Sequence, residues 1–292
     1  MFLRGFLFFA SLIIFLSCAT VSPVNSAREK AETFSAIGAV EPQWQEYSGS
    51  IGYFHGKIAE PLLEFWALRV DLFSPQTRIV VKGGAMDGSR VLSTRVTSFV
   101  RDNRLTAGIN AVPFDVISMF ERRPIKNIGV VISGGELISP ASPQYDALVF
   151  YRDGTTAIVS QSSINSGMEE NIENAIGGFR QILKDGQLVE RVLNLKPKHP
   201  RSAAGISANG RYLYLLVIDG RREGSTGSTE METALLLRSL GSEDGINFDG
   251  GGSTSLALRF PDGKVRAVNT PIHGGITGIE RAVAGCLGIS TP

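Results

Sequence analysis

An asparagine and an aspartate lead directly into a run of glycines near the C-terminal end of the chain. The segment reads Ile246-Asn247-Phe248-Asp249-Gly250-Gly251-Gly252-Ser253. Residues 246–249 are short and apolar enough for a buried strand, which would deliver Asp249 to its carboxyl end. Glycines adopt positive φ and leave backbone N–H groups bare, so the turn that follows could cradle an anion. The alternative is a tight hairpin whose glycines only satisfy the backbone geometry.

A second acidic residue stands at the end of another apolar run. Residues 212–218 are continuously apolar and lead into Asp219-Gly220-Arg221, a pattern typical of a strand that is buried on both faces. Residues 229–241 begin with a Thr-x-x-Glu capping box and end at a glycine, which predicts a helix. The order strand, helix, strand implies a crossover between parallel strands, whose carboxyl ends share one edge of the sheet. Asp219 and Asp249 are therefore expected to open into one crevice.

Two arginines and an asparagine are placed where they could join this crevice. Arg201 precedes an apolar segment that should form a neighbouring strand, and Arg221 lies two residues after Asp219. A planar guanidinium suits a phosphate or carboxylate, although the same charges could form only a structural ion-pair network. Asn110 ends a short apolar strand, where it could either enter the site or cap a turn. Together these residues indicate a pocket for a ligand that carries phosphate and hydroxyl groups.

Composition and charge narrow the classes of function. The chain has 29 lysines and arginines against 28 acidic residues, a net charge of +1, and no basic run, which argues against a nucleic-acid partner. Its two cysteines are Cys18 and Cys286, and the first lies in a segment that we expect to be processed, so no disulfide is expected. Cys286 stands in an apolar run that should form a buried final strand, where it would act as a small apolar residue.

Metal chemistry has weak support in the sequence. The three histidines are scattered without the spacing of metal ligands, and they are expected in loops or on the surface: His55, His199 and His273. No cofactor is assigned on this basis. An acidic crevice formed by Asp219 and Asp249 could nevertheless hold a divalent cation.

The N-terminus has the features of an export signal. Arg4 provides a positive charge, residues 5–16 form an apolar core too short to span a bilayer comfortably, and Ser17-Cys18 follows. A small residue directly before a cysteine resembles the lipobox of bacterial lipoproteins, in which that cysteine is lipidated. We therefore expect a signal peptide over residues 1–18, a lipid anchor at Cys18 and a tether over residues 19–43. The alternative is an ordinary signal peptide cut elsewhere, and in both cases the protein would work outside the cytoplasm, in the envelope or secreted.

The remaining chain, residues 44–292, reads as one domain. Residues 63–72 alternate as a half-buried strand, and residues 89–101 have apolar side chains at the spacing of a helix that covers a sheet. Residues 125–159 contain short strands separated by Gly-Gly and Asp-Gly turns, which indicates a meander of hairpins. With the crossover, these patterns predict an α/β fold of the mixed α+β kind. It would contain mixed β-sheets, covering helices and a C-terminal strand-helix-strand crossover that carries the site.

The motifs occur in an order that resembles the phosphodiester glycosidase family. Gly108-Ile109-Asn110 is followed by Arg201, by Asp219-Gly220-Arg221 and by Asn247-Phe248-Asp249-Gly250-Gly251-Gly252-Ser253-Thr254, and the order closes with Glu280-Arg281-Ala282-Val283-Ala284. The resemblance extends over residues 68–289, which is most of the chain after the export signal. The chain departs from the family pattern at two places. Residues 111–114 read Ala-Val-Pro-Phe instead of the more common Gly-Gly-Phe-Phe, and Thr270 stands where an arginine is usual.

The resemblance implies hydrolysis of a glycosyl phosphodiester, with a carbohydrate phosphodiester as the substrate. It implies that Asp219 or Asp249 acts on water or at the anomeric carbon. It also implies a set of groups that hold the phosphate, namely Arg201, Arg221 and the backbone N–H groups of Gly250, Gly251 and Gly252. Asn110 and Asn247 would bind sugar hydroxyls, while Ser253 would contact the phosphate or cap the turn. Because the leaving phosphate is already a stable anion, a strong general acid matters less than in ordinary glycosidases.

Two classes of function stay open from the sequence. In the first, an exported hydrolase cleaves a sugar-1-phosphate linkage in an envelope or extracellular glycan. In the second, the same pocket binds an anionic glycan without turnover, and the protein is a binding module tethered to the envelope.

Overall fold

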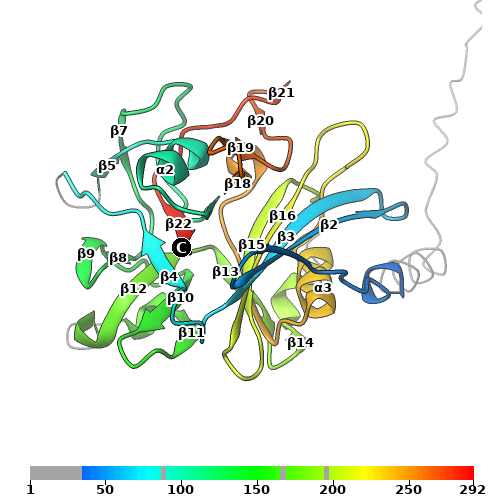
Figure 1. The fold of residues 1–292 in the computed structure, drawn as a ribbon, viewed down its shortest axis with the longest axis horizontal. Coiled ribbons are helices and arrows are strands. Elements are labelled where there is room, and N and C mark those ends of the chain that lie inside the picture. The colour runs from blue at the N-terminus through cyan, green and yellow to red at the C-terminus, as the bar shows by residue number, and fades with distance from the viewer. Residues whose placement is uncertain (1–34, 87–89, 165–168, 194–196) are drawn as a thin grey trace, which may run out of the picture.

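The largest element of the fold is an eight-stranded sheet (Figure 1). The computed structural model describes residues 35–86, 90–164, 169–193 and 197–292. The sheet contains, in spatial order, β1 (Gln45–Ser48), β2 (Ile51–Ile58), β3 (Leu63–Asp71), β16 (Tyr212–Ile218), β15 (Arg201–Ile206), β17 (Asp244–Asn247), β13 (Arg180–Lys184) and β14 (Gln187–Leu188).

Two five-stranded sheets pack beside this large sheet. The first contains β11 (Thr156–Ser160), β10 (Asp146–Tyr151), β12 (Ile172–Gly177), β8 (Val131–Ser133) and β9 (Glu136–Ser139). The second contains β19 (Val265–Ala267), β18 (Leu256–Arg259), β6 (Ala107–Asn110), β22 (Cys286–Ser290) and β4 (Arg78–Val81). Two short ribbons complete the strands: β20 (Ile272–His273) with β21 (Ile276–Thr277), and β5 (Arg90–Leu92) with β7 (Pro124–Lys126).

Helices are few and short in the described residues. The α-helices with complete bounds are α2 (Val96–Asp102) and α3 (Glu230–Leu240), residues 35–38 are also α-helical, and the 3-10 helices are η1 (Gln161–Ser163), η2 (Glu169–Asn171), η3 (Glu190–Val192) and η4 (Gly251–Ser253). The helix that the sequence indicated over residues 89–101 is therefore only half as long, because its first residues form β5 instead. None of the helices in the described ranges is long and apolar enough to cross a membrane.

The predicted strand-helix-strand crossover is present, but its two strands are not neighbours. Both β16 and β17 pair antiparallel with β15, which lies between them, so β16 and β17 run parallel to each other. The helix between them is α3, which begins at a capping box formed by Thr229 and Glu232 and ends at Gly241 with φ 111°. Their carboxyl ends therefore lie at one edge of the sheet, as the sequence indicated. Every strand pairing in the described residues is antiparallel, so the expectation of mixed sheets was wrong, and the fold contains much more strand than helix.

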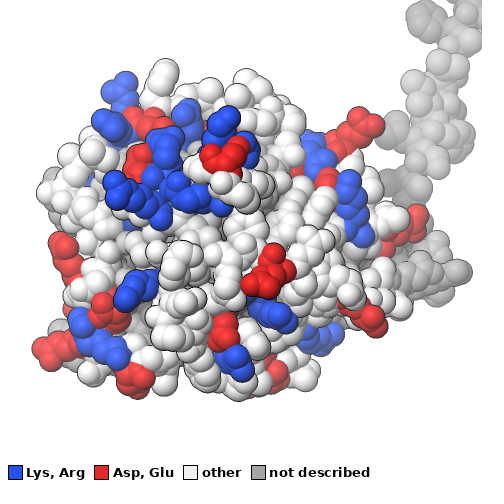
Figure 2. Space-filling view, in the orientation of Figure 1, with Lys and Arg blue, Asp and Glu red and all other residues white. Residues whose placement is uncertain are grey.

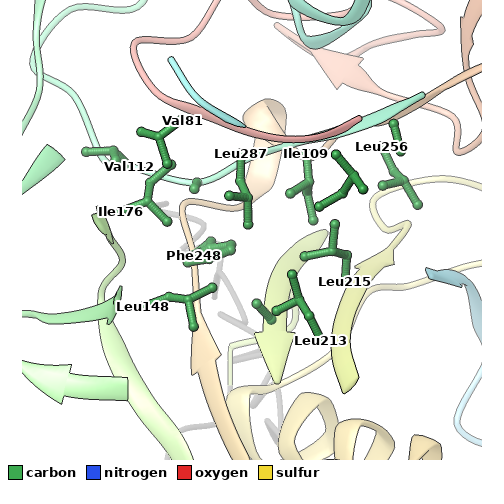
Figure 3. Packing of buried hydrophobic residues seen from close by; sticks show 14 of the residues in the cluster. Val81, Ile109, Val112, Leu148, Ile176, Leu213, Leu215, Phe248, Leu256 and Leu287 are labelled. Carbon is green, nitrogen blue, oxygen red and sulfur yellow. The ribbon is translucent and has the colours of Figure 1, made fainter. Parts of the chain in front are cut away.

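The main hydrophobic core lies where the three large sheets meet (Figure 3). Leu213 and Leu215 come from the eight-stranded sheet, Leu148 and Ile176 from the β11–β9 sheet, and Ile109, Leu256 and Leu287 from the β19–β4 sheet. Phe248 lies in the middle of this cluster and is completely buried, which anchors the segment immediately before the glycine run. Burying such a side chain stabilises the fold by about 2–3 kcal/mol.

The opposite face of the eight-stranded sheet is covered by α3. Ala234, Leu235 and Leu237 pack with Phe65 and Leu216 in a second core. Residues of β3 alternate between the two cores, so this strand is buried on both faces and not half-buried, as its alternation with polar residues suggested. The apolar run 212–218 is buried on both faces, which confirms the prediction.

Two terminal segments bear on the expected domain limits. Ile37 is completely buried in the α3 core, and its carbonyl accepts a hydrogen bond from Ser239 at 2.8 Å. Residues 35–43 are thus not all a free tether, because contacts with the fold begin before residue 44. The expected signal peptide and Cys18 lie outside the described residues. At the other end of the chain, Cys286 is buried in β22, as expected, and its burial raises the pKa of the thiol to about 12.

Candidate functional site

The glycine run forms a tight turn after β17, and at each of its three positions a different feature of the geometry requires a residue without a Cβ atom. Gly251 has a backbone φ of +60°, which residues with a Cβ atom rarely adopt. A Cβ on Gly250 would lie 2.7 Å from the carbonyl oxygen of Pro200, too close for any other residue. A Cβ on Gly252 would overlap the guanidinium of Arg281. The turn is therefore packed tightly between the chain before β15 and an arginine from the C-terminal region.

Two guanidinium groups flank this turn. The side chain of Arg221 lies over Gly251, where an added Cβ would be 3.3 Å from its Nη2 atom. Arg281 lies over Gly252 and donates a hydrogen bond from Nη1 to the Ser253 hydroxyl at 3.3 Å. Two permanent positive charges beside a short turn are the chemistry that binds a phosphate or another compact anion. Arg221 was expected at this place from the sequence, whereas Arg281 was noted only as part of a motif.

The backbone at Arg221 is strained in a way that aims its side chain. Its φ is 58°, in the left-handed region that residues other than glycine seldom occupy. The preceding Gly220 is pressed against the neighbouring loop, because a Cβ there would lie 2.7 Å from Gly227 and 2.8 Å from Pro200. Such strain persists only where the surrounding structure imposes it, and it is frequent at functional sites.

Each flanking arginine is paired with a histidine. Arg221 Nη2 lies 3.1 Å from His199 Nδ1, and Arg281 Nε donates to His273 Nδ1 at 2.9 Å. A guanidinium can only donate, so Nδ1 of both rings accepts and Nε2 carries the hydrogen. Burial and the nearby Arg201 and Arg221 lower the pKa of His199, and burial with Arg281 lowers the pKa of His273. Both rings are therefore neutral near pH 7.

The structure corrects the expectation of a loop or surface histidine for His273, which is buried in β20. His199 is half-buried and lies outside the named strands, as expected, but it is held by Arg221. Sequence spacing could not have found them, because each histidine meets an arginine that a different loop supplies. His55 stacks on Trp66, with 4.7 Å between the ring centroids, and its Nε2 lies 2.9 Å from a carboxylate oxygen of Glu64. It makes neither of the arginine contacts described for His199 and His273.

Asp249 is the carboxylate that directly precedes the glycine turn, and it lies close enough to Arg281 to interact with its charge. Burial raises the pKa of Asp249 to about 6, while Ser253, Arg281 and the Gly250 amide oppose that rise. Its backbone is fixed from both sides: the amide donates to the Ala111 carbonyl at 2.7 Å, and the carbonyl accepts from the Asn110 side chain at 2.6 Å. An acid with this pKa changes its protonation state in the range where hydrolytic enzymes work.

The Asp219 carboxylate, in contrast, is held by several hydrogen bonds and an ion pair within the fold. It is 1% exposed, and its carboxylate accepts hydrogen bonds from the Asn269 side chain at 3.0 Å and from the Thr270 amide at 3.0 Å. It also forms an ion pair with Arg222 at 2.8 Å, which is shared with Glu64. Burial raises the pKa of Asp219, and the bonds from Asn269 and Arg222 oppose that rise. The sequence could not choose between the two aspartates, and the structure distinguishes them by these contacts of Asp219.

The β16 and β17 loops do meet, although their two carboxylates do not act as a pair. Arg221 from the first loop lies on Gly251 of the second, so the expected crevice exists. The Asp219 carboxylate turns instead toward Arg222 and the 269–270 segment. A divalent cation between Asp219 and Asp249 stays a prediction, and at Asp219 it would share the carboxylate with these donors. Within the described ranges, no group of three or more His, Cys, Asp or Glu side chains is arranged to hold a metal ion.

Arg201 is placed near the site but is held by the chain. Its Nε donates to the Ser228 carbonyl at 3.0 Å, its Nη2 donates to the Pro197 carbonyl at 3.1 Å, and Nη1 lies 3.7 Å from Glu230. In β15 the side chain of Arg201 points to the α3 face, while that of Ser202 points to Asn110 on the other face. Arg201 is therefore a brace between β15 and the start of α3, and the structure does not support the expected direct hold on a phosphate.

The two asparagines have different situations. Asn110 is fully buried, and its Oδ1 accepts from Ser202 at 2.7 Å and from the Ser255 amide at 3.1 Å. With its amide on the Asp249 carbonyl, it positions the turn and is not available to a sugar, contrary to the expectation. Asn247 is 1% exposed, and its Oδ1 has no hydrogen-bond donor in the described part of the chain.

The turn amides are also only partly available. The Gly251 amide donates to the Pro200 carbonyl at 2.8 Å and the Ser253 amide to the Gly250 carbonyl at 3.1 Å. Of the expected backbone donors, Gly251 is therefore used by the fold. Ser253, which is 1% exposed, bridges the turn to Arg281, consistent with a residue that caps the turn.

A comparison with protein families identifies most of the chain. The family model described as phosphodiester glycosidase matches residues 103–290, which include Asn110, Asp249 and Arg281. The SPbeta prophage-derived uncharacterized protein YomE of Bacillus subtilis is 30% identical over 153 residues, which are 50% of this chain and 22% of that protein. The chain thus spans about a fifth of the length of this curated relative.

Solved structures share the fold. The catalytic domain of zebrafish N-acetylglucosamine-1-phosphodiester alpha-N-acetylglucosaminidase, auto-inhibited by its pro-peptide, has a TM-score of 0.64 and 18% identity, over 87% of both chains. A hypothetical protein from Synechocystis has a TM-score of 0.64 and 14% identity, over 87% of this chain and 64% of the other. At these identities the similarity concerns the fold.

Proposed function

Because the chain belongs to the phosphodiester glycosidase family, we propose that it hydrolyses the bond between the anomeric carbon of a sugar and the phosphate of a phosphodiester. One observation carries the proposal. The turn at Gly251 and Gly252 lies between the guanidinium groups of Arg221 and Arg281, immediately after a carboxyl group whose pKa is about 6. The arginines provide the charge for a phosphate, and Asp249 provides a group for the carbon-oxygen bond next to it.

The chemistry needs three functions, and this arrangement offers a group for each. The bond between the anomeric carbon and the phosphate oxygen breaks, and the phosphate monoester leaves with the electron pair. Arg221 and Arg281 would neutralise that leaving anion, and the Nε2–H of His199 or His273 could donate a further hydrogen bond to it. Ionised Asp249 would either take the proton of the attacking water or attack the anomeric carbon itself before water releases the sugar.

Neighbouring residues would hold these groups in place without touching the substrate's reacting atoms, or would bind its sugar. Asn110 holds the Asp249 carbonyl, and Asp219 holds Arg222 and the 269–270 segment behind the loop that presents Arg221. Asn247 is assigned to the sugar side, because its Oδ1 lacks a donor in the described residues and a sugar hydroxyl is a donor of the right kind. A bound water could satisfy the same atom.

The proposal includes the place where the reaction occurs. The sequence before residue 35 carries the pattern of an export signal, with Cys18 as the expected lipid anchor. A protein exported in this way would meet phosphodiester-linked sugars in the envelope or in extracellular glycans. The substrate would then be a carbohydrate phosphodiester outside the cytoplasm.

The experiment that tests the reaction follows the position of the broken bond. Purified protein is incubated with sugar-1-phosphate diesters in isotopically labelled water, and phosphorus NMR follows the conversion of diester to monoester. Glycosidic cleavage places the labelled oxygen on the released sugar, whereas cleavage at phosphorus would place it on the phosphate. The Asp249→Asn variant should lose turnover and still bind the diester.

The alternative, a binding module without turnover, predicts a different result from the same samples. Wild-type protein would bind the diesters in calorimetry and convert none of them, and Asp249→Asn would leave that binding unchanged. Label on the phosphate would refute cleavage at the anomeric carbon, and turnover that the Asp249→Asn substitution leaves unchanged would refute the assignment of Asp249.

A further inference from the structure

A short loop between β6 and β7 exposes an unusual number of apolar side chains. In residues 115–120 the exposed fractions are 53% for Val116, 61% for Ile117, 47% for Met119 and 67% for Phe120. Single exposed apolar residues are common on protein surfaces, but four within five consecutive positions form a patch that marks an interaction surface. The proposed hydrolysis does not use them.

The backbone of this loop is held in place while its apolar side chains stay in solvent. Two hydrogen bonds between Ser118 and Phe120 hold the turn. The Phe120 amide donates to the Ser118 hydroxyl at 3.0 Å, and that hydroxyl donates to the Phe120 carbonyl at 3.1 Å. Ser93 donates to the same carbonyl at 3.3 Å, and Arg95 donates to the Met119 carbonyl at 3.4 Å. The loop is thus fixed in an outward conformation, and ordering it would cost little when it binds.

Basic side chains surround the apolar loop. The loop and the β5–β7 ribbon carry four basic residues, Arg90, Arg122, Arg123 and Lys126, against the two acidic residues Asp115 and Glu121, and Arg95 lies beside them at the start of α2. Glu121 is already paired with Arg95 at 3.3 Å. This local excess of positive charge contrasts with the net charge of +1 for the whole chain. Figure 2 shows basic side chains gathered at the upper left, over the region where Figure 1 places α2, β5 and β7.

We propose that this loop and its basic surroundings dock on an anionic lipid surface, with Ile117 and Phe120 inserted and the arginines on the headgroup phosphates. The composition fits a bilayer interface, because apolar tips enter the acyl boundary while long cationic side chains reach the phosphates. A protein partner would have to supply an apolar groove with an acidic rim. The inference does not depend on the proposed reaction.

Docking would bring the candidate site to the membrane surface. Ser118 forms a β-bridge with Ala282, and Arg95 donates to the Glu280 carbonyl at 3.2 Å. These contacts tie the loop directly to the segment that carries Arg281. A docked molecule would therefore hold its anion-binding turn close to phosphodiester-linked sugars that are displayed at a lipid surface.

The test uses the full chain and reads the signal of one added tryptophan above that of the native Trp44 and Trp66, which every variant shares. Phe120→Trp is mixed with vesicles of phosphatidylcholine alone, or with an equal share of phosphatidylglycerol, and tryptophan quenching by brominated lipid is measured. Phe73→Trp is the matched control, because Phe73 is 64% exposed in another turn. Both variants carry the same N-terminal segment, so any membrane attachment through that segment is common to them.

The proposal predicts quenching and a blue-shifted emission for Phe120→Trp on anionic vesicles, reduced at high salt, and neither effect for Phe73→Trp. The double variant Ile117→Ser/Phe120→Ser should lower partition onto the anionic vesicles by on the order of tenfold or more, from the lost apolar burial. Leu137→Ser, at an exposed apolar position in β9, should leave that partition unchanged.

Three results would overturn the docking proposal. They are a Phe120→Trp side chain that remains in water with every vesicle, equal quenching at both positions, or partition that does not depend on the anionic lipid. The first of these, combined with binding of an acidic protein surface that Phe120→Ser abolishes, would assign the loop to a protein partner.

Discussion

Replacing Asp249 by asparagine should lower activity and raise stability at the same time. Burial raises the pKa of Asp249 from 3.8 to about 6, so the folded protein must hold this carboxylate ionised, at a cost, above pH 6. A shift of that size corresponds to roughly 3 kcal/mol of destabilisation, and because the residue is partly accessible we expect a gain of about 1–3 kcal/mol for Asp249→Asn. Loss of the carboxylate should also lower kcat by about 100- to 10,000-fold.

The pH dependence gives this prediction its sign. The unfolded chain ionises Asp249 near 3.8 and the folded chain near 6, so wild-type protein loses this part of its stability as the pH rises between those values. The asparagine side chain cannot ionise, so the variant keeps this part of its free energy of unfolding as the pH rises. The free energies of unfolding of the two proteins should agree below pH 4 and diverge up to pH 6, with a constant difference above. Denaturant titrations across this range, with turnover measured on the same samples, provide the assay.

The Asp219→Asn variant is the matched control, because the expected result is the opposite. That substitution weakens the hydrogen bonds from Asn269 and Thr270 and leaves Arg222 with Glu64 as its acidic partner, which should cost about 1–3 kcal/mol of stability. The reasoning is refuted if Asp249→Asn destabilises the protein above pH 6, if its stability difference from wild type does not change with pH, or if it retains full turnover.

Other substitutions test separate parts of the site. Arg281→Met should raise KM and weaken inhibition by inorganic phosphate about 10- to 100-fold, measured by steady-state kinetics, and Arg281→Lys should restore only part of the loss because it lacks the planar fork. Gly252→Ala should displace the Arg281 guanidinium and lower kcat/KM to a similar degree, and an unchanged kcat/KM would contradict the close packing seen there. Thr229→Ala should cost about 1 kcal/mol in denaturant unfolding through the lost capping box of α3, while KM stays the same.

The sequence could predict the features that depend on local pattern. The continuous apolar run 212–218, the capping box and the glycine after α3 each depend on neighbours within a few residues, and all three are present. The shared edge of β16 and β17 also followed, because a strand-helix-strand order leaves two strands parallel. The insertion of β15 between them could not be predicted, since strand order is decided by contacts across the whole chain.

The roles of individual site residues depended on partners that are distant in sequence. Asp219 and Asp249 look alike in their local motifs, and only the distant partners Asn269, Thr270 and Arg222 distinguish the carboxylate of Asp219. Arg201 shows a second limit. Side chains alternate between the faces of a strand, and the sequence of β15 does not reveal which parity faces α3. The roles of Arg281, His199 and His273 could not be predicted either, because they depend on partners that are distant in sequence.

The backbone around residue 249 joins two separate sheets. Asp249 follows β17 of the eight-stranded sheet, yet both of its peptide hydrogen bonds go to Asn110 and Ala111 at the end of β6 in another sheet. The carboxyl group proposed to react thus lies at the junction of two sheets, and a small displacement of one sheet relative to the other would change its orientation before either sheet unfolds. Catalysis should then be the most sensitive gauge of looseness in the molecule, failing at temperatures where the overall secondary structure is still complete.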